Sequence, residues 1–182
     1  MNKVNPFLYQ NIDNSNHWII SEIILNQCKQ HPNKKIIQFA GGPEWSFDDL
    51  KNIAFEKAKI LRDLSIKQGD TVTVMVDDPI DFIPYWIASS FLGVMFVALN
   101  TALNGSVLHH QIRLANSNVI IVSDVYYENV AQLVQEKKIK IKAFNCSELK
   151  STGMILEKDV YHGKISDEVC TMFTSGTSGP SK

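Results

Sequence analysis

The feature that most constrains the fold is the alternation of apolar segments with amphipathic helical stretches between Thr71 and Phe144. The apolar segments are short and rich in Val, Ile and Thr, which is typical of buried strands. Strands that alternate with helices predict β-α-β units, and therefore an α/β fold with a largely parallel β-sheet flanked by helices. The predicted strands are residues 71–76, 94–98, 118–122 and 139–144.

The elements outside this alternation are predicted from local signals. Apolar residues at helical spacing predict a helix from Trp18 to Cys28, and Lys35 to Ala40 indicates a strand that turns at Gly41 into a second short strand. Ser46, with Asp49 three residues later, predicts the capped start of a helix. Residues 145–167 show no clear period and predict a loop with a little helix. We find no internal repeat and no interdomain linker.

One stretch raises the alternative of a membrane span. Phe82 to Leu99 contains 18 residues without a charge, which is close to the length that crosses a bilayer. Pro84 and Gly93 interrupt it, and no Lys or Arg flanks it as an anchor. We therefore expect a buried helix and strand divided at Gly93, with a span as the alternative.

Charge and cysteine content exclude several classes of protein. The chain has 18 basic and 19 acidic residues, a net charge of −1 that gives no indication of nucleic-acid binding. Cys28, Cys146 and Cys170 are odd in number and far apart, so neither a disulfide framework nor a zinc site is supported. We expect buried free thiols in a reducing, cytoplasmic protein. The N-terminus shows no signal-peptide pattern, and weak peripheral membrane contact is compatible with the sequence.

Other candidate sites are weaker. His109 and His110 are adjacent and cannot face one another on a helix, so we predict no metal site there. Asp77, Asp78 and Asp81 are interpreted as turn and helix-start residues. We name no metal ligands.

The strongest functional signal is the segment Thr174–Lys182, which follows an apolar stretch, Val169 to Phe173, that we predict to be a buried strand. Its glycines allow backbone amides to approach phosphate oxygens, its hydroxyls are donors, and its lysine adds a positive charge. It is not a Walker A loop, whose Lys directly follows Gly and precedes Ser or Thr. The alternative is a flexible Gly/Ser linker. The candidate phosphate-binding residues are Thr174, Ser175, Gly176, Thr177, Ser178, Gly179 and Lys182.

This segment resembles the phosphate-binding signature of the adenylate-forming superfamily, which contains acyl-CoA synthetases and the adenylation domains of peptide synthetases. The chain departs from the usual motif at Ser178, where Thr is common, and at Pro180, which comes one place early. Further resemblance lies in Trp45–Leu50, in Gly69-Asp70 and in Gly93–Asn100. Residues 99–111 resemble the carnitine/crotonobetaine–CoA ligase branch.

The resemblance implies a fold, a reaction and a set of partners. The fold would be the N-terminal part of the large domain of an adenylate-forming enzyme. In the reaction, ATP with Mg²⁺ and a carboxylate form an acyl-adenylate and pyrophosphate, and CoA then takes the acyl group. Residues 174–182 would hold the phosphates. Catalytic residues are expected downstream of Lys182.

The resemblance also implies that residues 1–182 are a partial AMP-binding (adenylation) domain whose C-terminal remainder is absent. We expect the isolated fragment to be inactive. Two alternatives stay open: a non-catalytic truncated paralogue or interaction module, and an adenylation enzyme without CoA transfer. The sequence does not identify the acyl substrate or the oligomeric state.

Overall fold

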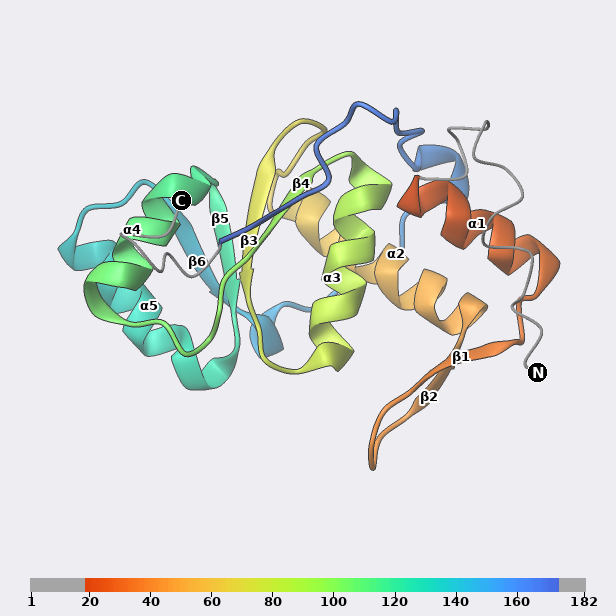
Figure 1. Cartoon of the computed structure of the whole chain (residues 1–182), viewed down its shortest axis with the longest axis horizontal. Helices are drawn as coiled ribbons and strands as arrows, with labels where there is room; N and C mark the ends of the chain where they lie inside the picture. Colours follow the sequence, from red (N-terminus) through yellow and green to blue (C-terminus); the bar gives the residue numbers. More distant parts are fainter. Residues whose placement is uncertain (1–18, 174–182) are drawn as a thin grey trace, which may run out of the picture.

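The computed structural model describes residues 19–173 of the 182-residue chain. Its centre is a five-stranded sheet in the order β6-β5-β3-β4-β7, in which neighbouring strands run parallel (Figure 1). The predicted α/β fold with a largely parallel sheet is therefore confirmed. The strands are β3 (Thr71–Met75), β4 (Met95–Ala98), β5 (Val119–Val122), β6 (Lys142–Asn145) and β7 (Cys170–Met172).

Helices cover both faces of this sheet (Figure 1). Helices α2 (Phe47–Asp63) and α3 (Pro79–Leu92) cover one face, and α1 (Ile20–Gln30) packs against both of them. Helices α4 (Gly105–Ala115) and α5 (Asp124–Glu136) cover the other face.

Side chains alternate between these two faces along each strand. In β3, Val72 and Val74 join the core beneath α2 and α3, whereas Met75 joins the core beneath α4 and α5. Thr73 points to the second face, where its hydroxyl lies 2.6 Å from that of Ser117. The central strands are thus buried on both sides, as their Val- and Ile-rich sequences predict.

The connections between the parallel strands place helices on both faces of the sheet. The chain moves from β3 to β4 through α3 on one face, and then in the opposite direction to β5 and β6 through α4 and α5 on the other face. Residues 146–169 return across the α3 side to the far edge, where β7 begins (Figure 1). They contain two short 3-10 helices, so the predicted loop with a little helix is confirmed.

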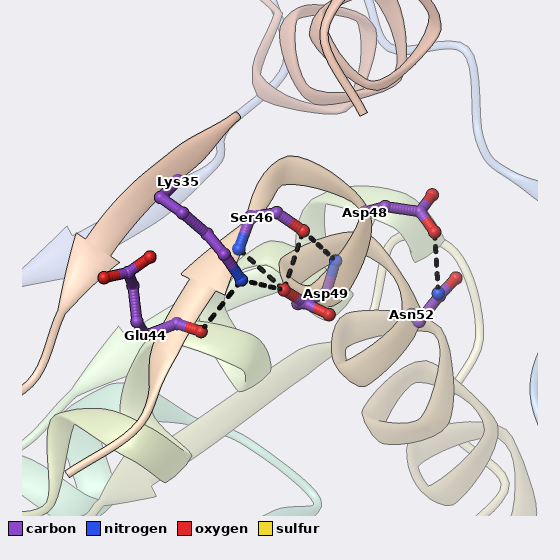
Figure 2. A network of polar contacts seen from close by, with 6 residues as sticks. All are labelled: Lys35, Glu44, Ser46, Asp48, Asp49 and Asn52. Carbon is purple, nitrogen blue, oxygen red and sulfur yellow. Dashed lines mark hydrogen bonds and ion pairs between the residues drawn. The ribbon is translucent and has the colours of Figure 1, made fainter. Parts of the chain in front are cut away.

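The start of α2 is fixed by the predicted cap (Figure 2). It follows an antiparallel hairpin of β1 (Lys35–Gln38) and β2 (Glu44–Ser46). The hydroxyl of Ser46 accepts from the amide of Asp49 at 3.2 Å, and the amide of Ser46 donates to the Asp49 carboxylate at 2.8 Å. The backbone amide and hydroxyl of Ser46, with Lys35 at 3.3 Å, lower the pKa of Asp49 to about 2. The cap thus joins the hairpin to the helix.

The long apolar stretch forms a helix and a strand, as predicted. Helix α3 ends at Gly93, whose φ of 64° provides a left-handed cap, and β4 begins two residues later at Met95. Among residues 19–173, none of the helices combines the length and the apolar character needed to cross a membrane.

One strand begins later than predicted. The prediction placed a strand at 139–144, but β6 starts at Lys142. Lys138 has a φ of 51°, and the amide of Ile139 donates to the Val134 carbonyl at 3.0 Å, so this part closes the end of α5. Ile139 and Ile141 pack into the core beneath α5, so their alternating apolar pattern is that of a strand although they lie before β6.

Candidate nucleotide site at the carboxyl edge of the sheet

The strand before the predicted phosphate-binding segment occupies one edge of the sheet. Cys170 of β7 pairs with Phe96 of β4, and Met172 pairs with Ala98, in parallel register. The amide of Phe96 donates to the carbonyl of Val169 at 3.0 Å. Because the pairing is parallel, the chain leaves β7 towards Thr174 at the edge where β3, β4 and β5 also end.

The predicted phosphate-binding residues themselves lie outside the described residues. The structure therefore places the strand that leads to them, and their role stays a prediction. The residues concerned are Thr174, Ser175, Gly176, Thr177, Ser178, Gly179 and Lys182.

The prediction that this strand is buried is wrong. Met172 is 66% exposed, and Cys170 and Thr171 are also exposed. Within residues 19–173, β7 has β4 on one side and no strand on the other. The expectation of buried thiols fails for Cys170 for the same reason.

The other two cysteines are buried, as predicted. Burial raises the pKa of the Cys146 thiol to about 11, so this thiol stays protonated and unreactive at neutral pH.

The strand order changes direction where β3 and β5 end side by side. The chain leaves β3 towards α3 on one face and leaves β5 towards α5 on the other face, so the two connections diverge. In open α/β sheets, ligands bind outside the carboxyl ends of strands at such a point. The strand order therefore makes this edge the candidate ligand-binding edge.

Polar side chains join the two strand ends at this position. The Ser123 hydroxyl donates to the Asp77 carboxylate at 2.7 Å, and the Tyr126 hydroxyl lies 3.5 Å from its other oxygen. The hydrogen bond from Ser123, with the backbone amides of Asp77 and Asp78, lowers the pKa of the Asp77 carboxyl group. Asp77 is therefore a carboxylate at neutral pH, held at the ends of β3 and β5.

Sequence analysis missed this contact. Ser123 occupies the cap position of α5, but its hydroxyl is directed to Asp77. The signal that could have found the contact is the position of both residues just after predicted strands.

The neighbouring acidic residues lie at the start of α3, as predicted, and each has a partner. Asp78 caps α3 by accepting from the amide of Ile80 at 2.8 Å, and Asp81 pairs with Lys57 at 2.7 Å. In the part of the chain that the structure describes, no three His, Cys, Asp or Glu side chains are placed to hold a metal ion.

A cavity of about 410 Å³ opens at the opposite edge, where the strands begin. It is lined by Gly69, Gly93, Tyr161, Asp167 and Val169, among other residues. Because it lies at the amino ends of β3, β4 and β7, it is separate from the candidate nucleotide edge. The general rule for ligand sites in parallel sheets favours the carboxyl edge.

Comparison with known proteins identifies the family of the chain. The family model described as AMP-binding enzyme matches residues 24–182, which includes the whole of the candidate segment. The 2-succinylbenzoate–CoA ligase of Oceanobacillus iheyensis is 28% identical over 169 residues, covering 90% of this chain and 32% of that protein. The 4-coumarate–CoA ligase 2 of rice is 25% identical over 122 residues, covering 66% of this chain and 21% of that protein.

Solved structures show the same fold. The o-succinylbenzoate coenzyme A synthetase of Bacillus subtilis, in complex with AMP, superposes with a TM-score of 0.75 at 19% identity, covering 87% of this chain and 40% of that chain. A fatty acyl CoA synthetase of Mycobacterium tuberculosis gives a TM-score of 0.74 at 17% identity, covering 90% of this chain and 34% of that chain. The chain spans about a third of the length of the first curated relative and resembles the N-terminal part of such ligases. The family model, which covers most of the sequence, shows that the chain belongs to the AMP-binding enzyme family.

Proposed function

We propose that this chain is the N-terminal portion of an ATP-dependent carboxylic acid–CoA ligase. The observation that carries the proposal is the parallel docking of β7 on β4, which brings the chain to the carboxyl edge of the sheet just before Thr174–Lys182 in the sequence. Family membership and the names of the CoA-ligase relatives support the same reaction class. The protein would convert a carboxylate into an acyl-adenylate with release of pyrophosphate, and then transfer the acyl group to CoA.

The residues fit a polyphosphate ligand. Glycines and hydroxyls in Thr174–Lys182 supply backbone and side-chain donors, and Lys182 supplies a positive charge. Their task would be to position the phosphates and to neutralise the charge that develops as pyrophosphate leaves. Mg²⁺ would arrive bound to the phosphates of ATP, since this ion keeps few protein ligands.

The finer assignments are part of the proposal. The printed names of the relatives point to 2-succinylbenzoate and 4-coumarate as acids to test first. The carnitine-like branch and a role in fatty acid metabolism stay predictions. We place the protein in the cytoplasm, and its three unpaired cysteines support a reducing compartment.

The proposed domain organisation has a direct test. The intact mass of the native protein can be measured after detection of a peptide within Trp45–Lys59. A mass far above the 20.5 kDa of this chain would support the larger ligase. A native mass of 20.5 kDa would favour the non-catalytic module instead.

The proposed reaction is tested with the full-length protein. ATP binding and ATP–pyrophosphate exchange would be measured with a panel of carboxylic acids, in the wild type and in Lys182→Ala. We expect Lys182→Ala to slow exchange by about a hundredfold, as for the loss of one charged contact to a transition state. The matched control Lys137→Ala, at the exposed end of α5, should leave the rate unchanged.

Two results would contradict this function: a full-length wild type that binds no ATP, or equal rates for Lys182→Ala and the wild type. Exchange without acyl-CoA formation would indicate adenylation alone. The 182-residue chain by itself should form no acyl-adenylate.

A further inference from the structure

The inference concerns the segment that precedes β7. The chain crosses from β6 to the far edge of the sheet through residues 146–169, a connection with two short 3-10 helices and no longer regular element. Strand β7 itself has only three residues. Such a short edge strand makes few ladder hydrogen bonds, so its position depends on what holds the preceding residues.

Tyr161 is held against the end of α3 by close packing. Its amide donates to the Phe91 carbonyl at 2.8 Å, and its ring lies over Gly93. A Cβ atom added to Gly93 would lie only 2.5 Å from the ring. The absence of a side chain at Gly93 is therefore what gives the ring its place.

Asp167 closes the turn between Tyr161 and β7. One oxygen of its carboxylate accepts from the Tyr161 hydroxyl at 2.8 Å and from the Lys164 amide at 2.7 Å. The amide of Asp167 in turn donates to the Lys164 carbonyl at 3.0 Å. Two residues later, the Val169 carbonyl accepts the amide of Phe96, which ties the end of this segment to β4.

We propose that Tyr161, held by Asp167 over Gly93, is a positioning residue for the phosphate-binding segment. The contacts of Tyr161 with the end of α3 and with Asp167 hold the start of β7 in position. The register of β7 on β4 in turn determines where the chain enters Thr174–Lys182. The nucleotide part of this inference rests on the proposed function. Tyr161 lies at the amino edge of the sheet and does not touch the nucleotide edge.

The first test measures the position of β7 without a nucleotide. In Tyr161→Phe the ring remains but its hydroxyl, and with it the bond to Asp167, is lost. Hydrogen exchange of the Phe96 amide reports β7 directly, because this amide donates to Val169. We expect it to exchange about fivefold faster, the effect of one typical hydrogen bond. The Leu99 amide, which donates to Val74 of β3, is the internal control and should be unchanged.

A matched variant controls for the loss of a tyrosine hydroxyl. Tyr126→Phe removes a hydroxyl near Asp77 at the other edge of the sheet, and it should leave the Phe96 amide unchanged. Equal exchange of the Phe96 amide in Tyr161→Phe and the wild type would overturn the inference. So would equal acceleration of the Phe96 and Leu99 amides, since that would indicate a general loss of stability.

The second test measures nucleotide use by the full-length protein. Tyr161→Phe should raise the KM for ATP about fivefold in pyrophosphate exchange, with the KM for the carboxylic acid unchanged. Faster Phe96 exchange with an unchanged KM for ATP would refute a role in positioning the segment. A wild type that neither binds nor uses ATP would overturn the proposed function, whereas the amide exchange would still decide whether Tyr161 holds β7.

Discussion

Replacing Gly93 by alanine should be far more harmful than replacing another glycine of positive φ. At Gly93 the φ is 64°, which costs a residue with a side chain about 1–2 kcal/mol. The new Cβ would also lie at 2.5, 2.8 and 2.9 Å from three atoms of the Tyr161 ring. The ring has to withdraw by about 1 Å to reach ordinary contact distance. Such overpacking typically costs about 1–3 kcal/mol more, so we expect a total loss of about 3 kcal/mol.

Gly69 provides the matched comparison. Its φ is 83°, but an added Cβ would meet no atom within 4 Å. Gly69→Ala should therefore cost only the backbone strain, about 1 kcal/mol. The difference between the two variants isolates the contact with Tyr161, because both introduce the same methyl group at a position of positive φ.

The assay is equilibrium unfolding in urea, with the free energy of unfolding compared at equal m-values. Measuring Gly93→Ala again in a Tyr161→Ala background removes the ring, and the loss should then fall to about 1 kcal/mol. Equal losses for Gly93→Ala and Gly69→Ala, or an unchanged loss in the Tyr161→Ala background, would refute the reasoning.

The remaining predictions concern the cap of α2 and the buried hydroxyl pair. Ser46→Ala should lower the free energy of unfolding by about 1 kcal/mol, measured in urea, because the cap of α2 is lost. The pKa of Asp49 is about 2, below its ordinary value of 3.8. Its carboxylate therefore stabilises the fold at any pH above 3.8, and this stabilisation is lost as the pH falls to about 2. In Asp49→Asn, acid titration should show a smaller loss of stability in that range, and an unchanged titration would contradict the assignment. Ser117→Ala should cost about 2 kcal/mol because it leaves the buried Thr73 hydroxyl without its partner. Thr73→Val should lower the free energy of unfolding by less, about 1 kcal/mol, because the Ser117 hydroxyl still donates to the Val119 carbonyl. Equal losses for the two variants would argue against a hydrogen bond in which Thr73 donates to Ser117.

The central strands and their helices could be predicted because both faces of β3 and β5 are buried. A strand such as Val119–Val122 is apolar at every position and fits only the interior of an α/β sheet that helices cover on both faces. The boundary of β6 could not be predicted in this way. Ile139 and Ile141 are apolar because they pack under α5, and a pattern of apolar residues does not distinguish that role from a strand.

The candidate site was predictable in its motif but not in its surroundings. Thr174–Lys182 is recognisable in the sequence because each residue type has a use with phosphate. The contact of Asp77 with Ser123 depends on β5 lying beside β3, and the exposure of β7 depends on its place at an edge. Which strands lie side by side is a long-range property of the chain, which local sequence patterns do not encode.

The path from β6 to β7 has a consequence for the order in which the protein folds during synthesis. The strands β3, β4, β5 and β6 are adjacent to one another and all precede residue 146, so they can pair before β7 leaves the ribosome. Strand β7 then joins the side of β4 that the earlier strands leave unpaired. Within residues 19–173, β7 is thus the last strand to join the sheet, and changes within it should leave the folding of the earlier strands intact.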